Sequence, residues 1–230
     1  MRRALFCLLV LGLVTAPLAA SAQDSKPREI VHGAYAKAAI GYQGWFFTPY
    51  VSYGTQFAFG GGYDFVDQLA FTVGAEGNFH LSTVNGLSGA ALGAQGQSPV
   101  QGDFQSLAGL FSLRAAYNFG GRDIRRLSVF VRAGGGVWFS PEARNAEDPD
   151  NPILLGKSPH GHAVPAVDVA LGLEYFTRLS HFSLGLEAEM IGLVNPGAPT
   201  AVDAGLSGFV PNININFLLK YTFGKPEQRS

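Results

Sequence analysis

The sequence predicts an all-β protein, an eight-stranded antiparallel transmembrane β-barrel. The first observation is the stretch 209–223, whose odd positions are mainly apolar or aromatic while its even positions are mostly polar. This period of two gives a strand one apolar and one polar face. The stretch exceeds the roughly five or six residues of an ordinary strand and suffices for the roughly 9–11 residues that cross a bilayer. The alternative is an unusually long strand on the surface of a soluble protein.

The second observation is the distribution of charge. Charged residues make up only 14% of the chain, against roughly 25% in an average soluble domain. The charged residues on the predicted strands all lie on the face opposite the apolar one: Lys37, Asp64, Glu76, Arg114, Arg132, Asp168, Glu174, Glu187, Glu189 and Lys220. A charge that faces lipid near the middle of the bilayer costs about 2–4 kcal/mol, so a membrane barrel requires this segregation.

The start of the chain has the features of a secretory signal peptide, predicted to span residues 1–22. Arg2 and Arg3 form a basic region, an uncharged apolar run follows, and a small-residue cleavage site ends at Ala22. A membrane-spanning helix is the alternative, and the shortness of the apolar run counts against it. Because Cys7 lies inside this segment, the mature chain is expected to have no disulfide, thiolate nucleophile or cysteine metal site.

The first two predicted strands cover residues 33–44 and 50–65. Residues 33–44 alternate small apolar side chains with polar ones, and Trp45 and Phe46 belong to a short connection that ends at Pro49. Residues 50–65 carry mainly aromatic and β-branched residues at odd positions, with small and polar residues opposite. Both segments therefore favour strands with one lipid-facing side.

The next two predicted strands cover residues 69–81 and 104–119. A tight turn at 66–68 precedes the first of them, and a Gly-, Ser- and Gln-rich loop without periodicity at 82–103 separates the two. Both strands alternate Leu, Phe and Ala with polar or charged residues, as a barrel wall requires.

Three more predicted strands, 127–139, 164–176 and 181–191, precede the C-terminal one. Long loops at 140–163 and 192–208 interrupt the alternation on either side of the last two. Short connections are predicted after the second, fourth and sixth strands, at 66–68, 120–126 and 177–180. The connections after the other strands are mostly long, and the short segment 45–49 after the first strand is the exception. An even strand number, with short turns on one side and longer loops on the other, is typical of outer-membrane barrels.

This arrangement predicts one barrel over residues 33–223, located in the outer membrane of a Gram-negative cell. The flanking segments 23–32 and 224–230 are expected to be periplasmic tails. Outer-membrane lipid is then an expected partner. No basic patch is present, so no nucleic-acid partner is expected.

The charged face of the strands predicts a packed polar interior. An eight-stranded barrel is just wide enough for side chains to fill, and inward glycines leave room for large neighbours. We expect Lys37, Arg114, Arg132 and Lys220 to pair with the inward carboxylates, and we expect no sizeable pore. A proton or ion path along these charges is the alternative hypothesis.

With eight such strands, the chain resembles the small eight-stranded outer-membrane proteins of the OmpA and OmpX type. Asn216, Tyr221 and Phe223 match polar and aromatic positions of the C-terminal sorting signal of such barrels. This resemblance implies the barrel-assembly machinery as a partner. The chain departs from the signal at Leu218, where the family favours glycine, and in the residues 224–230 that follow the last aromatic.

The first predicted hairpin is also similar in style to an outer-membrane β-barrel domain of myxobacterial and related proteobacterial proteins. The similarity lies in Tyr35-Ala36-Lys37 and in the Gly- and aromatic-rich run 59–65. Some of those proteins belong to gliding-motility complexes. The resemblance therefore implies envelope or motility-complex proteins as partners.

Two small groups of residues suggest a catalytic site or a metal site as alternatives to a purely structural barrel. His80 and Ser82 share one strand face and, with an acid near the membrane edge, would suit a lipid-modifying enzyme; the alternative is that they are polar residues at the rim. His160 and His162 in the second long loop, with acidic residues upstream, would suit a divalent metal, although an H-x-H pair in a polar loop also arises by chance.

The sequence therefore favours a non-catalytic outer-membrane barrel, with no assigned catalytic, cofactor or metal residue and no cofactor. We expect a structural or anchoring role in an envelope or surface complex, such as a gliding-motility machine. A lipid-modifying enzyme and a narrow channel or small-ligand carrier are the alternatives.

Overall fold

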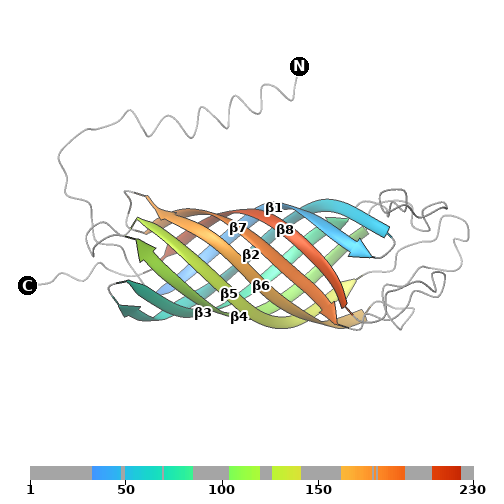
Figure 1. The fold of residues 1–230 in the computed structure, drawn as a ribbon, viewed down its shortest axis with the longest axis horizontal. Coiled ribbons are helices and arrows are strands. Elements are labelled where there is room, and N and C mark those ends of the chain that lie inside the picture. Colours follow the sequence, from blue (N-terminus) through green and yellow to red (C-terminus); the bar gives the residue numbers. More distant parts are fainter. Residues whose placement is uncertain are drawn as a thin grey trace, which may run out of the picture.

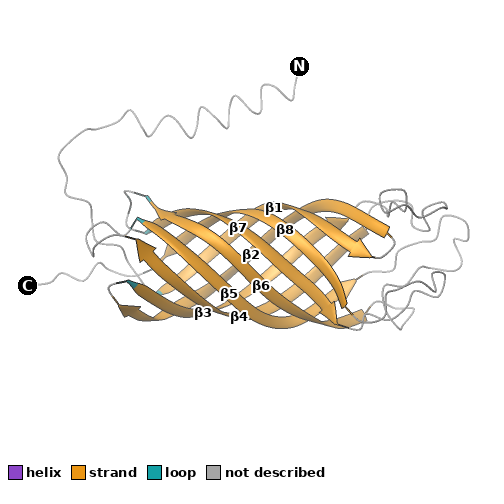
Figure 2. Ribbon diagram, viewed as in Figure 1, coloured by secondary structure: helices purple, strands orange, loops and turns teal. Residues whose placement is uncertain are grey.

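The computed structural model describes residues 33–47, 50–68, 70–84, 104–119, 126–140, 162–177, 179, 181–194 and 209–223. These residues form eight strands (Figures 1 and 2): β1 (Ala34–Phe47), β2 (Tyr50–Gln68), β3 (Phe71–Val84), β4 (Phe104–Phe119), β5 (Leu127–Ser140), β6 (His162–Phe176), β7 (Phe182–Val194) and β8 (Phe209–Thr222). The predicted signal peptide 1–22 and the tails 23–32 and 224–230 lie outside the described residues.

The strands form one closed, antiparallel barrel. Each strand pairs with the next along the chain, and β8 pairs with β1. The predicted fold class is therefore confirmed. Within the part of the chain that the structure describes, no helix is long and apolar enough to cross a membrane.

The two ends of the barrel differ in their connections. At the short-turn end, β2 joins β3, β4 joins β5 and β6 joins β7 through short segments, and the first and last described residues, Gly33 and Phe223, lie there as well. Backbone hydrogen bonds from Asp64 N to Gly33 O (3.0 Å) and from Phe223 N to Ala34 O (2.7 Å) tie these termini to the wall. The opposite end, where residues 85–103, 141–161 and 195–208 connect strands, is called the long-connection end below.

Two predicted connections are wrong. Trp45 and Phe46 belong to β1, because pairing with β2 continues to Phe47↔Tyr50. Residues 66–68 belong to β2, because a bulge between Asp64 and Val66 absorbs one residue and lets pairing with β3 continue to Gln68. A bulge shifts the side-chain alternation without ending the strand, so the loss of periodicity was mistaken for a turn. At the long-connection end β3, β5, β6 and β7 extend beyond the predicted bounds, because backbone pairing continues there, whereas at the short-turn end β3 begins at Phe71 and β7 at Phe182, later than predicted.

The two faces of the wall have the predicted polarity. In β8 the even residues from Val210 to Thr222 are buried inside, whereas the odd ones are mostly exposed on the outer face. The ten charged residues singled out from the sequence all lie in the barrel interior, and none lies among the large apolar side chains outside. The outer face near the short-turn end carries a band of aromatic residues: Tyr63, Phe65, Phe71, Tyr117, Phe119, Tyr175, Tyr221 and Phe223. Such a band is typical of a membrane interface.

Two prolines mark where the wall is incompletely paired at the long-connection end. The β1–β8 ladder ends at Trp45↔Asn212, next to Pro211, and the β6–β7 ladder ends at Ala166↔Leu193, next to Pro165. Proline has no N–H to donate to a ladder. At this end β7 and β8 therefore pair with each other beyond the points where β7 stops pairing with β6 and β8 stops pairing with β1.

Inward glycines provide room for bulky interior side chains, as the sequence predicts. The ring of Phe130 on β5 lies over Gly172 on β6: a Cβ at Gly172 would lie 2.6 Å from Phe130 Cε1 and 2.8 Å from the backbone oxygen of Leu186. Leu218, which departs from the sorting-signal pattern, packs inside with Ala39, Ala58, Ala116 and Phe130.

Replacing Gly172 by alanine is expected to destabilise the barrel by about 1–3 kcal/mol, because overpacking forces the Phe130 ring and the backbone apart. Urea unfolding of the refolded protein, followed by its heat-dependent shift on a gel, measures the effect. The matched control is Gly77→Ala, since a Cβ there would meet nothing closer than Leu110 O at 4.0 Å. Equal stability of the two variants would contradict the packing argument.

Candidate functional site

Arg132 lies at the centre of the barrel interior, where its guanidinium binds four carboxylates. It projects from β5 and is 1% exposed. Its Nη1 lies 2.8 Å from Glu76 Oε1 and 3.2 Å from Glu187 Oε2, and its Nε lies 3.1 Å from Asp168 Oδ2. Its Nη2 donates to Glu189 Oε1. One guanidinium thereby links β5 to β3, β6 and β7.

Asparagines on the inward face of β8 bind the buried carboxylate of Glu189. Its Oε2 accepts hydrogen bonds from the side-chain amides of Gln56, Asn214 and Asn216, each at 3.1 Å. The polar face that first identified this strand is thus the face that solvates a buried carboxylate. Amide donors of this kind stabilise the ionised form of a carboxylate that is removed from water.

Glu76 receives its own set of donors. The Tyr35 hydroxyl donates to its Oε2 at 2.8 Å, the Asn78 amide donates to its Oε1 at 2.9 Å, and the Lys37 ammonium forms an ion pair with it. Donors from β1, β3 and β5 therefore meet at one side chain, which fixes the relative positions of these strands.

A second ionic cluster lies nearer the short-turn end. Arg114 and Lys220 both bind Glu174, and the Ser183 hydroxyl donates to the same carboxylate. Arg114 Cζ also lies 4.5 Å from the centre of the Phe130 ring, a cation–π distance. The predicted pairing of inward bases with inward acids is therefore present in both clusters.

The interior holds more acids than bases. Within the described strands the inward bases are Lys37, Arg114, Arg132 and Lys220, and the inward acids are Asp64, Glu76, Asp168, Glu174, Glu187 and Glu189. The surplus falls around Arg132, because the second cluster matches Arg114 and Lys220 with Glu174 and Asp64. The middle of the barrel is thus the acidic layer.

An aromatic pair covers this layer toward the long-connection end. Trp45 from β1 and Trp138 from β5 meet with ring centres 5.3 Å apart and an interplanar angle of 55°. The two strands lie opposite each other in the closed order, so the rings span the interior. Sequence reasoning missed this pair because Trp45 was assigned to a connection, although it continues the inward alternation of Gln43. Leu193 and Val210 are also fully buried near this end.

His80 and Ser82 share one face of β3, as predicted, and that face is the interior. His80 is 2% exposed; its Nδ1 lies 2.6 Å from Gln56 Nε2 and its Nε2 lies 3.6 Å from Glu189 Oε1. Ser82 is buried as well. The histidine therefore has an acid beside it, but both residues lie inside the wall rather than on an exposed rim.

The candidate metal ligands remain a prediction. His160 lies outside the described residues, and His162 belongs to β6 but its side chain is not described. Among the side chains that are described, no group of three or more His, Cys, Asp or Glu residues is arranged to hold a metal ion.

Comparison with known proteins supports the architecture. No protein-family model matches the chain, and no curated protein sequence matches it. Among solved structures, the chain is similar to neisserial surface protein A, with a TM-score of 0.55, 11% identity, and coverage of 83% of this chain and 97% of that one. The chain has the fold of the small eight-stranded outer-membrane β-barrels.

Two further solved barrels align over similar lengths. Ail, the attachment invasion locus protein of Yersinia pestis, gives a TM-score of 0.43 at 11% identity, covering 83% of this chain and 100% of that one. OprG from Pseudomonas aeruginosa gives 0.42 at 14% identity, covering 87% and 100%. The likeness to small eight-stranded barrels is confirmed at the level of the fold by the alignment with neisserial surface protein A.

Replacing Arg132 by methionine is expected to destabilise the barrel by about 3–5 kcal/mol, because it leaves buried carboxylates without their counter-charge. Urea unfolding in detergent measures the loss. The stability of Arg132→Lys should lie between that of the parent and that of Arg132→Met, since an ammonium has fewer donors than a guanidinium and no planar fork. Adding Glu187→Gln and Glu189→Gln to Arg132→Met should recover part of the stability. A methionine variant as stable as the parent would contradict the central role of the guanidinium.

Proposed function

We propose that this protein is a non-catalytic barrel resident in the outer membrane, closed to ion flow, that acts as a structural or anchoring component of the cell envelope. The observation that carries the proposal is the filled interior. Ionic clusters occupy the middle and the short-turn end, and the Trp45–Trp138 pair spans the interior toward the long-connection end. A channel needs a continuous polar path, and these side chains lie across the interior in its middle and toward each of its ends.

The outer surface supports the proposed location. The wall exposes large apolar side chains around its circumference, including Ile40, Phe111, Leu171 and Ile215. Exposure of that extent is costly in water but matches hydrocarbon. With the short-turn end facing the periplasm, both termini would be periplasmic, and the long connections would face outward.

The non-catalytic reading has a specific argument at His80. A lipid-modifying enzyme has to bring its nucleophile and base to a lipid headgroup, whereas His80 and Ser82 are buried on the interior side of the wall. The structural role of His80 is its contact with Gln56 and Glu189. We therefore expect the lipid A of cells that carry His80→Ala to be identical to that of parent cells by mass spectrometry. A difference specific to His80→Ala would favour the enzyme hypothesis.

Purified protein in planar lipid bilayers is expected to give no conductance steps. The double variant Trp45→Ala, Trp138→Ala tests which layer seals the interior, because it removes the aromatic cover and leaves the ionic clusters intact. Stable single-channel steps from the parent protein would overturn the proposed closure and support the channel alternative.

Crosslinking in intact cells tests the anchoring role, with an affinity tag placed after Ser230. The tag should be protected until the outer membrane is permeabilised, and the protein should fractionate with outer membranes. We expect the tag to recover a reproducible set of envelope proteins, and motility proteins if the role extends to gliding. Recovery of the assembly machinery alone would count against a scaffold.

A further inference from the structure

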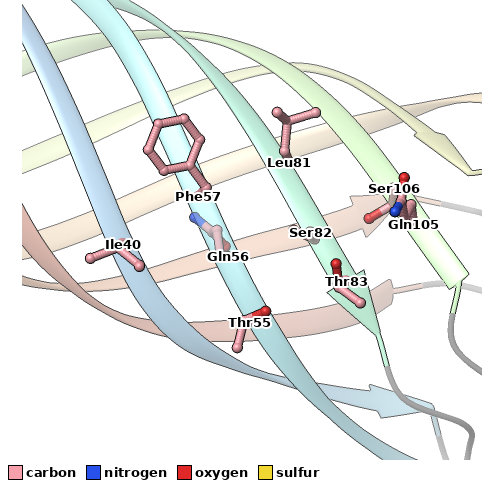
Figure 3. Close-up of a pocket in the computed structure, with 9 residues that line it drawn as sticks. All are labelled: Ile40, Thr55, Gln56, Phe57, Leu81, Ser82, Thr83, Gln105 and Ser106. Carbon is pink, nitrogen blue, oxygen red and sulfur yellow. The ribbon is translucent and has the colours of Figure 1, made fainter. Parts of the chain in front are cut away.

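A hollow of about 300 Å³ lies in the wall of the barrel near its long-connection end, across β1 to β4 (Figure 3). Its apolar part is formed by Ile40, Phe57 and Leu81, which point to the outer face and are about half exposed. This volume is at the lower end of the roughly 300–1,000 Å³ typical of small-molecule sites. Because these residues belong to the apolar outer surface, whatever fills the hollow includes hydrocarbon.

A row of neutral polar side chains borders the hollow on the side of the long connections. Thr55, Thr83 and Gln105 are consecutive partners across β2, β3 and β4. The next row toward the middle of the barrel, Phe57, Leu81 and Leu107, is wholly apolar. The hollow therefore lies where the apolar surface gives way to hydrogen-bonding groups, the level at which acyl chains meet the headgroup region.

The interior side of the wall is polar at the same level. Gln56, Ser82 and Ser106 face the interior at the level of the polar row and also border the hollow. Within the described residues, Gln56 Oε1 and Ser106 Oγ have no hydrogen-bond partner, although both residues are more than nine-tenths buried. Atoms of this kind occur at other depths of the interior as well, among them Asn78 Oδ1 and Asn214 Oδ1, so the two beside the hollow belong to the interior polar network and are not accessible to an occupant of the hollow.

The chemistry of the lining restricts the occupant. Its polar groups are hydroxyls and amides, and none of the described residues that border the hollow is charged. A phosphate would be recognised by Arg or Lys, so the hollow does not suit a phosphate headgroup. It suits a hydrocarbon chain that carries a hydroxyl or amide near its polar end.

We propose that this hollow binds an acyl chain of lipopolysaccharide. The acyl chains of that lipid carry hydroxyl groups and amide linkages close to the sugar, which match the Thr55–Thr83–Gln105 row. The hydrocarbon lies against Ile40, Phe57 and Leu81. The assignment rests on the proposed location and orientation, which put the long-connection end in the outer leaflet.

Native mass spectrometry of the refolded full chain in detergent tests the proposal without relying on its cellular location. The probes are purified rough lipopolysaccharide and, separately, phosphatidylglycerol with unhydroxylated chains. The parent protein is expected to retain one lipopolysaccharide molecule and to retain phosphatidylglycerol at least tenfold less. Thr83→Phe, which fills the hollow, should reduce lipopolysaccharide retention at least fivefold, and Thr55→Val should reduce it without adding bulk.

The matched control is Ala133→Phe, which adds the same ring to the outer face of β5, away from the hollow. It should retain lipopolysaccharide as the parent does, and the heat-dependent gel shift verifies that every variant is folded. Equal retention by Thr83→Phe and the parent would overturn the site. Equal retention of the two lipids would overturn the assignment to hydroxylated chains. Failure of the protein to fractionate with outer membranes would instead overturn the proposed function.

Discussion

The charge of a guanidinium in the interior of a narrow barrel has to be neutralised by neighbouring carboxylates. Arg132 imposes that requirement on every strand near it. Its donors reach Glu76, Asp168, Glu187 and Glu189, so β3, β6 and β7 each have to place an acid at the same depth. Those acids in turn need donors, which the chain supplies from β1, β2 and β8. A buried ionic cluster contributes little net stability compared with an apolar core, but it is intolerant of partial pairing. It therefore specifies one register for the whole barrel.

The bilayer sets the complementary constraint on the outer face. All backbone groups in hydrocarbon have to be paired, which closes the sheet, and the side chains there have to be uncharged. The volume of the interior follows from closure with eight strands, and large interior side chains then require glycines opposite them. The pairing of Phe130 with Gly172 is an example. The high glycine content, the low charge and the aromatic outer face are thus consequences of one geometry.

The sequence predicted those features that depend on alternation alone. The strand number, the two faces, the inward position of each charge and the room that inward glycines leave for large neighbours all follow from a period of two. The strand ends were less predictable, because the bulge at Asp64 and Val66 shifts the alternation while the hydrogen bonds continue. Which acid pairs with which base could not be derived either. That depends on the stagger between strands far apart in sequence, such as β5 and β7, which no local pattern records.

The barrel has a more constrained part and a less constrained part. The ionic clusters tie most strands together from the middle to the short-turn end, whereas the ladders of β1–β8 and β6–β7 stop beside Pro211 and Pro165 at the other end. There the interior contacts change from ion pairs to the Trp45–Trp138 pair, apolar neighbours and the neutral hydrogen bond from Asn212 to Gln43. Apolar contacts are less directional than ionic ones, so this end can accept changes in side-chain shape without unpairing a buried charge. The acidic middle thus fixes the register of the wall, and the long-connection end, where the hollow across β1 to β4 lies, is held by contacts that do not depend on buried charge.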